Sequence, residues 1–174
     1  MSVKELIGDY DAFIAQVNRG LEESGIAREE LALLDHLGYR TETIDEYRDA
    51  LDAFRALGED MGEIVIQGRP ISIIALQNPI ESGGWTIPFL EVIAPKAGSP
   101  YPSGLEHAEF VTVKLLKDFE KEHAELPFIR DAMNRRINPE LKYREKGISV
   151  KFHRLSIGSV VQIENELNRD SDAM

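Results

Sequence analysis

Cysteine is missing from the 174-residue sequence, which excludes disulfides, thiolate zinc sites and a cysteine nucleophile. Long apolar runs are missing as well, because none approaches the roughly 20 residues of a membrane-spanning helix. Positive charge is scarce, since 20 lysines and arginines stand against 31 aspartates and glutamates and leave a net charge of −11. That balance argues against binding to nucleic acid or to anionic membranes, which needs clustered cations. We therefore expect no nucleic-acid partner and no membrane partner.

Several common functional motifs are absent too. The sequence has no GxGxxG, Walker-type GK[ST], HExxH or GxSxG motif and no EF-hand loop. These absences weigh against nucleotide binding by the common loops, zincin chemistry and the usual serine hydrolases. The N-terminal residues are polar and acidic, unlike a signal peptide, so we expect a cytoplasmic protein. An apolar content of 43% suits a single domain over residues 1–174, while the oligomeric state stays open.

An amphipathic helix is predicted within residues 1–27. Ser2 and Glu5 fit a capping box, and apolar residues then recur at three- and four-residue spacing until Gly25. Such a stripe is typical of a helix that packs against a protein core, and a partner-binding helix is the alternative.

Two similar halves follow this helix. Residues 31–95 read as strand, helix and three strands, and a Pro- and Gly-rich connector spans residues 96–104. Residues 105–167 repeat the order. In this second half we predict a helix over residues 114–125 and leave residues 127–135 open as a further helical turn. Its strands are predicted at 105–112, 136–145, 148–155 and 159–166.

Histidine and glutamate recur at matching places of the two halves. His36 and His107 lie in the first predicted strands, and Glu91 and Glu164 lie in the last ones. If both sheets curve around one cavity, these nitrogen and oxygen donors converge and suit a divalent transition metal. Unrelated polar residues on half-solvated strands are the alternative. Glu91 favours the metal, because an unpaired carboxylate inside the apolar segment IPFLEVIAPK would be costly.

Three further residues are candidates for the same cavity. Glu109 shares a strand face with His107 and is a candidate general base or a partner of the metal ligands. Arg40, on the predicted face of His36, is a candidate clamp for a substrate carboxylate, or else a partner for an acidic side chain. His153 is a candidate substrate-binding residue, with a structural or surface role as the alternative.

The motifs DHLGYRTET, LEHAEFV, VKFH and SIGSVVQIE carry a resemblance that runs from about Ala32 to Glu166. On them the sequence resembles the YecM-like family of the vicinal oxygen chelate superfamily, which also contains glyoxalases, extradiol dioxygenases and methylmalonyl-CoA epimerases. The resemblance implies an α+β fold of two paired βαβββ modules around a metal, here with an extra N-terminal helix. By position it implies the ligands His36, Glu91, His107 and Glu164. Glu166 competes with Glu164, because the two lie on one strand face, and the match of FLEV to QIEN favours Glu164.

The resemblance also implies a class of function. We expect a metal-binding protein that is an isomerase, epimerase or lyase, or an oxidoreductase, for a small oxygenated metabolite. Zinc, nickel, manganese, cobalt and magnesium all suit such donors. A protein of the same fold that binds a small ligand without turnover is the alternative.

Overall fold

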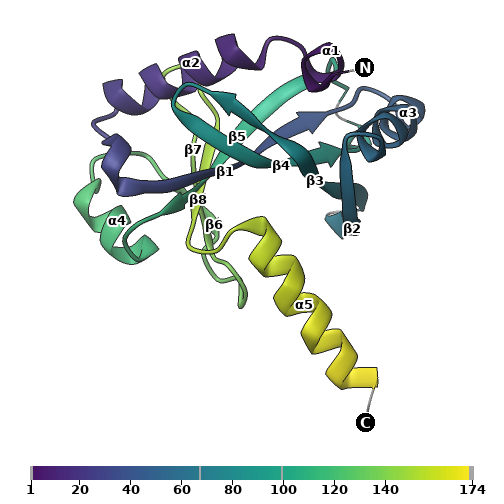
Figure 1. Cartoon of the computed structure of the whole chain (residues 1–174). Helices are drawn as coiled ribbons and strands as arrows, with labels where there is room; N and C mark the ends of the chain where they lie inside the picture. The colour runs from purple at the N-terminus through teal and green to yellow at the C-terminus, as the bar shows by residue number, and fades with distance from the viewer. Residues whose placement is uncertain (1, 67, 99, 173–174) are drawn as a thin grey trace.

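The computed structural model describes residues 2–66, 68–98 and 100–172, and its chain starts with two helices rather than one (Figure 1). Helix α1 (Val3–Ile7) has the predicted Ser2–Glu5 capping box, and helix α2 (Tyr10–Glu23) follows. The single predicted helix is wrong at Gly8, whose φ of 84° ends α1. Asp9 then caps α2 by accepting a hydrogen bond from the Ala12 amide.

The first βαβββ module follows the sequence prediction closely. It comprises β1 (Leu31–Arg40), α3 (Ile44–Arg55), β2 (Gly58–Ile66), β3 (Arg69–Ser82) and β4 (Trp85–Ile93). Thr43 caps α3, because its hydroxyl accepts from the amide of Glu46. The short 3-10 turn η1 (Arg28–Glu30) leads into β1.

The second module has the predicted order but not the predicted bounds. It comprises β5 (Gly104–Thr112), α4 (Leu116–Glu122), β6 (Ile129–Ala132), β7 (Glu140–Tyr143) and β8 (Val150–His153). Strand β6 lies in the segment that was left open as a helical turn. Without β6, the predicted second and third strands of the module correspond to the observed third and fourth, β7 and β8. The predicted fourth strand then falls beyond the module.

The predicted strand at residues 159–166 is therefore wrong, and the segment belongs to helix α5 (Ile157–Asp172). The β-branched residues of SVVQIE favoured a strand, but helix-starting contacts decide the outcome. Ser156 caps the helix by accepting from the Ser159 amide, and the Asp35 carboxylate accepts from the Ile157 amide. The apolar residues Val160 and Val161 then lie on the side of the helix that lines a cavity.

One eight-stranded sheet joins the two modules in the order β2-β3-β4-β1-β5-β8-β7-β6. Strands β1 and β5 pair antiparallel at its centre, and each pairs parallel with the last strand of its own module, β4 or β8. The predicted pair of βαβββ modules with an N-terminal helical addition is thus confirmed, as a vicinal oxygen chelate fold.

The main core fills one side of this sheet. Leu34 and Leu37 of β1 belong to it, and so do Phe54 of α3, Val17 of α2 and Phe119 of α4. In Figure 1, α2 lies along the sheet while α5 projects from the opposite side. Within the described residues, no helix combines the length and apolar character needed to cross a membrane. The remaining sheet face, near the start of α5, is where the candidate site lies.

Candidate metal centre

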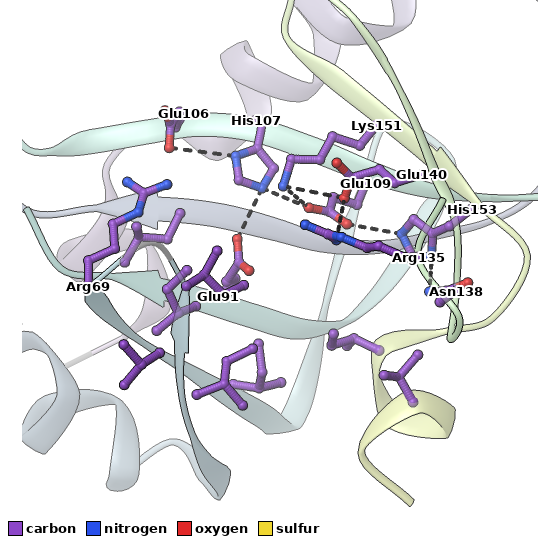
Figure 2. A pocket seen from close by; sticks show the side chains of 18 of the residues that line it. Arg69, Glu91, Glu106, His107, Glu109, Arg135, Asn138, Glu140, Lys151 and His153 are labelled. Atoms are coloured by element: carbon purple, nitrogen blue, oxygen red, sulfur yellow. Dashed lines mark hydrogen bonds and ion pairs between the residues drawn. The ribbon is translucent and has the colours of Figure 1, made fainter. Parts of the chain in front are cut away.

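Four adjacent central strands bring one cluster of titratable side chains together (Figure 2). Ligand atoms of His36, Glu91, His107 and Glu109 all lie within 4.8 Å of one another, and the four side chains are buried. Strand β1 supplies the first of these residues, β4 the second, and β5 the last two. The arrangement therefore offers two imidazoles and two carboxylates to one point in space.

Glu109 is the centre of this cluster. Its carboxylate oxygens lie 3.3 Å from Nε2 of His36, 3.0 Å from Nε2 of His107 and 3.0 Å from Nε2 of His153. The Lys151 ammonium also donates a hydrogen bond to it. Because this one carboxylate contacts three imidazoles and an ammonium, it is an integral part of the cluster.

One imidazole has a tautomer that its neighbour sets. Nδ1 of His36 lies 2.9 Å from Oδ2 of Asp35. A carboxylate accepts hydrogen bonds, so this Nδ1 carries a proton and the neutral ring presents a bare Nε2. Nδ1 of His153 faces both an acceptor and a donor, because it lies 2.6 Å from the Leu155 carbonyl oxygen and 2.9 Å from the Asn138 side-chain nitrogen. Hydrogen bonding of this kind orients histidines that bind metals.

The Nε2 atoms that face Glu109 lie close to its carboxylate but form no hydrogen bond of good geometry with it. Those of His36, His107 and His153 are buried and make no hydrogen bond, although carboxylate oxygens lie nearby. Buried polar atoms without a hydrogen-bond partner are rare and call for an explanation such as an ion. A metal ion between the imidazoles and the carboxylates would supply the missing partner, so the residues fit a divalent metal.

Gly38 makes room for one of the histidines. It pairs with His107 across β1 and β5, and a Cβ atom at this position would lie 2.4 Å from Cε1 of the imidazole. Such a distance is well inside van der Waals contact, so any side chain at position 38 would displace the ring. The glycine therefore positions His107 above the sheet.

Lys151 occupies a position that has a counterpart in the first module. Gly38 of β1 pairs with Glu91 of β4, and the equivalent residue of β5, Glu109, pairs with Lys151 of β8. The lysine thus stands where strict symmetry would place a second Glu91. The second carboxylate comes instead from Glu109, the equivalent of Gly38.

Ion pairing within the cluster shifts its pKa values. Burial alone would lower the pKa of His36, but Glu109 and Asp35 outweigh it and raise that pKa to about 10. Burial and Lys151 lower the pKa of His107, but the neighbouring carboxylates raise it to about 9. Burial raises the pKa of Glu91, but Lys151 and His107 reverse this effect and bring it to about 2. Burial raises the pKa of Glu109 as well, but Lys151 and His36 hold it well below its usual range. Both Glu91 and Glu109 therefore stay ionised, as metal ligands must.

The cluster lies at the wall of a cavity of about 1150 Å³. Isoleucines of β3 and β4 form an apolar wall beside it, namely Ile71, Ile73 and Ile93. Helix α5 contributes Ile157 and Val160 from the other side. This volume is large enough for a small metabolite next to the cluster.

Some predicted site residues lie elsewhere than expected. Glu164 lines the cavity from α5, not from a strand, and it is not among the residues whose ligand atoms converge. Glu166 is an exposed residue of the same helix. Arg40 faces the cavity, but its guanidinium stacks on the Tyr101 ring and lies 3.6 Å from Glu106. His153, predicted for the substrate, contacts Glu109 and belongs to the cluster.

Three residues of the site escaped the sequence analysis. Simple alternation along a strand would point Asp35 away from His36, but a β-bulge between Leu34 and His36 breaks the alternation and Asp35 contacts the His36 ring. Lys151 belongs to the VKFH motif, but only the register of β8 shows its equivalence to Glu91. Arg69 lines the cavity from the start of β3, where the sequence reads only Gly68-Arg69-Pro70 and carries no functional motif.

Comparisons with solved structures support this fold. A structural genomics protein designated EC4020 has a TM-score of 0.75 at 23% identity, with 94% of this chain and 97% of that chain covered. Methylmalonyl-CoA epimerase from Mycobacterium tuberculosis has a TM-score of 0.54 at 13% identity, with 77% and 95% covered. A hypothetical protein from Bacillus halodurans C-125 has a TM-score of 0.50 at 20% identity, with 70% and 93% covered. At these identities the likeness shows the fold alone.

A comparison with curated proteins gives no match. A family model described as YecM protein, however, matches residues 2–134, which include His36, Glu91, His107 and Glu109. Strand β8 and helix α5 lie beyond the matched residues. Since the match spans more than half of the sequence, the chain belongs to the YecM protein family.

Proposed function

We propose that this protein is a member of the vicinal oxygen chelate superfamily that binds one divalent metal ion through His36, Glu91, His107 and Glu109. The observation that carries the proposal is the convergence of these four buried side chains within 4.8 Å on three adjacent strands, β4, β1 and β5. Lone buried Nε2 atoms on the two imidazoles support it. Two nitrogen and two oxygen donors suit zinc, nickel, manganese or cobalt, and magnesium less well because of the imidazoles.

The role of Glu109 in this proposal is that of a ligand rather than of a free base. Its carboxylate already lies within ion-pair distance of His36, His107 and His153. A general base needs an oxygen that is directed to the substrate, whereas both oxygens of Glu109 are directed to the cluster. Glu109 thus takes the place that the sequence analysis gave to Glu164.

We further propose that the protein acts on a small oxygenated metabolite as a metal-dependent isomerase, epimerase or lyase. A divalent ion polarises a substrate carbonyl and stabilises the negative charge that develops on its oxygen. The protein's own contribution is to orient the ligand His36 through Asp35 and to enclose the substrate beside an apolar wall. Epimerase and lyase reactions share such an oxyanion, so the proposal names this class.

Metal analysis of protein purified without added metal tests the first part of the proposal. We expect about one equivalent of a transition metal per chain, or binding of one equivalent of Zn²⁺ or Ni²⁺ by calorimetry. The variant His36→Ala/His107→Ala should lose that binding. His123→Gln is a matched control, because His123 is also buried but pairs with Glu30 outside the cluster.

Deuterium exchange tests the second part. Small hydroxy- and keto-acids in D₂O should exchange the proton next to their carbonyl group in the presence of the metal-loaded protein, as followed by ¹H NMR. The double variant should not catalyse this exchange. Absence of metal binding combined with tight binding of an apolar ligand would instead support the non-catalytic alternative, a small-ligand-binding protein of the same fold.

A further inference from the structure

Arg69 is a cavity-lining arginine that has no ion-pair partner in the described part of the chain, although its charge helps to lower the pKa of nearby Glu106. Among the described residues no carboxylate lies within 4.0 Å of its guanidinium, although the chain carries 31 acidic residues. Its Nε is buried and makes no hydrogen bond to residues 2–66, 68–98 or 100–172, and its Nη1 donates to the Tyr101 hydroxyl over 3.4 Å. A buried guanidinium donor without an acceptor is costly unless a ligand supplies one.

Arg40 shows by contrast what a satisfied arginine in this region looks like. Its guanidinium lies 4.2 Å from the Tyr101 ring centroid, its Nε donates to the Pro102 carbonyl, and Glu106 lies 3.6 Å away. These contacts tie the connector to β1 and leave Arg40 little capacity for a ligand. The role of carboxylate clamp that the sequence suggested for Arg40 is therefore better suited to Arg69.

The position of Arg69 relates it to the metal cluster. Arg69, Ile71 and Ile73 alternate along β3 and line the cavity together, and Ile73 pairs with Glu91 of the cluster. Ile73 follows Arg69 by four positions along the strand, which is about 13 Å of backbone. Figure 2 shows Arg69 on one side of His107 and Lys151 on the other.

We propose that Arg69 binds an oxyanionic group, a carboxylate or a phosphate, at the end of a ligand whose apolar middle packs on Ile71 and Ile73. A guanidinium offers parallel N–H donors that match both anions. Such an anionic group would be part of the substrate of the proposed metal enzyme. Only the opposite end of the ligand, which would face the metal, depends on the proposed function. Binding at both ends requires a ligand with an anionic group several bonds away from the oxygens that face the cluster.

Titration of the metal-free protein with hexanoate, hexyl phosphate and hexanol tests the inference without the metal. Chemical-shift changes in ¹H–¹⁵N spectra give the affinity of each. We expect at least one of the two anions to bind about tenfold or more tightly than hexanol, as charge-assisted hydrogen bonds predict. The tighter of the two anions identifies the headgroup.

Variants of Arg69 give the decisive comparison. Arg69→Met should weaken anion binding by about tenfold or more, to the level of hexanol, and Arg69→Lys should give a smaller loss because it keeps the charge but not the fork. Arg144→Met is the matched control, since Arg144 lines the second-module side of the same cavity. Unchanged anion affinity in Arg69→Met, or in Arg69→Lys if the first variant does not fold, overturns the inference.

Wild-type protein that binds neither anion better than hexanol overturns it as well. Metal analysis of the same preparations keeps this result separate from the proposed function. A protein that takes up metal normally but ignores both anions contradicts only the role of Arg69. A protein that binds the anions through Arg69 but takes up no metal contradicts only the metal centre.

Discussion

The two βαβββ modules place a histidine at the same position of their first strands, yet they supply their carboxylates from different strands. In the first module the acid is Glu91 on the last strand, and the residue two places after His36 is Gly38. In the second module the acid is Glu109, two places after His107, and the last strand offers Lys151 at the equivalent register. One backbone pattern thus carries two different sets of side chains.

These two differences compensate each other. A strict copy of Glu91 in β8, added to Glu109, would put three carboxylates into one buried cluster, where like charges repel strongly. Lys151 avoids this and pairs with Glu109 instead. Gly38, for its part, leaves the space that the His107 ring occupies. The divergence of the modules therefore keeps one cluster at a charge that burial tolerates.

The largest effect is expected from pH, because it acts on the histidines of both modules. Metal binding requires neutral imidazoles, whereas neighbouring carboxylates raise the pKa of His36 to about 10 and that of His107 to about 9. Below pH 9 two protons must leave, so metal affinity should rise about hundredfold per pH unit between pH 7 and 8. Calorimetry with a competing chelator measures this rise, and an affinity that is independent of pH contradicts it.

The stability of the metal-free protein should change in the opposite direction. Both histidines have a folded-state pKa above the ordinary 6.5, so their ion pairs stabilise the fold fully below about pH 6.5. That stabilisation is lost as the pH rises through 9 to 10. Urea titrations at pH 6.5 and 9.5 should therefore show a lower free energy of unfolding at the higher pH.

Removing the second module's carboxylate should cost more than removing that of the first. Glu109→Gln leaves Lys151 and three histidines around an uncharged amide, and breaking a buried pair costs about 3 kcal/mol of unfolding free energy. Metal affinity should fall by about a hundredfold. Glu91→Gln should weaken metal binding comparably but destabilise the fold less, because His107 is the only residue in the described part of the chain within ion-pair distance of Glu91. Equal losses of stability in the two variants would argue against the central position of Glu109.

Gly38→Ala tests the other difference between the modules. The added methyl group would lie 2.4 Å from the His107 ring, so the imidazole must move away from the cluster. We expect metal affinity to fall about tenfold to hundredfold, the range seen when the orientation of a ligand is disturbed. Ala108→Gly is the control, because it changes a buried position next to His107 without adding atoms. Gly58→Ala would not serve, since its added methyl group would collide with the backbone of Ala75. Tight metal binding by the Gly38 variant would show that the ring has another place to lie.

The sequence predicted the first module and three members of the cluster, and the reasons are local. The Thr43 cap, the apolar stripe of α3 and the paired histidines are all visible within a few residues. The second module failed at β6, a four-residue strand with three exposed side chains and hence no apolar alternation to detect. That omission moved the last strand onto α5 and the last ligand onto Glu164.

Pairing across strands is the information that the sequence did not hold. The equivalence of Lys151 to Glu91 follows from the register of β8 on β5, in which Lys151 pairs with Glu109, 42 residues earlier in the sequence. The contact of Asp35 with His36 follows from a bulge that simple alternation does not include. Arg69 is visible in the sequence only as a residue between Gly68 and Pro70, and its lack of an ion-pair partner among the described residues is a property of the folded cavity.

The smallest effect is expected from Glu164, the residue that symmetry of the sequence singled out. It lies on α5, which begins after both modules are complete, and its carboxylate is not among the converging ligand atoms. Glu164→Gln should therefore change metal affinity by less than about twofold, within the usual range of a surface substitution. Glu164 lines the same cavity as Glu109, so each substitution to Gln removes one negative charge from that cavity. A difference in metal affinity between the two variants therefore reports direct coordination of the metal rather than the charge of the cavity. A hundredfold loss in Glu164→Gln would mean that α5 folds over the cluster when the metal binds, and that both modules contribute an acid after all.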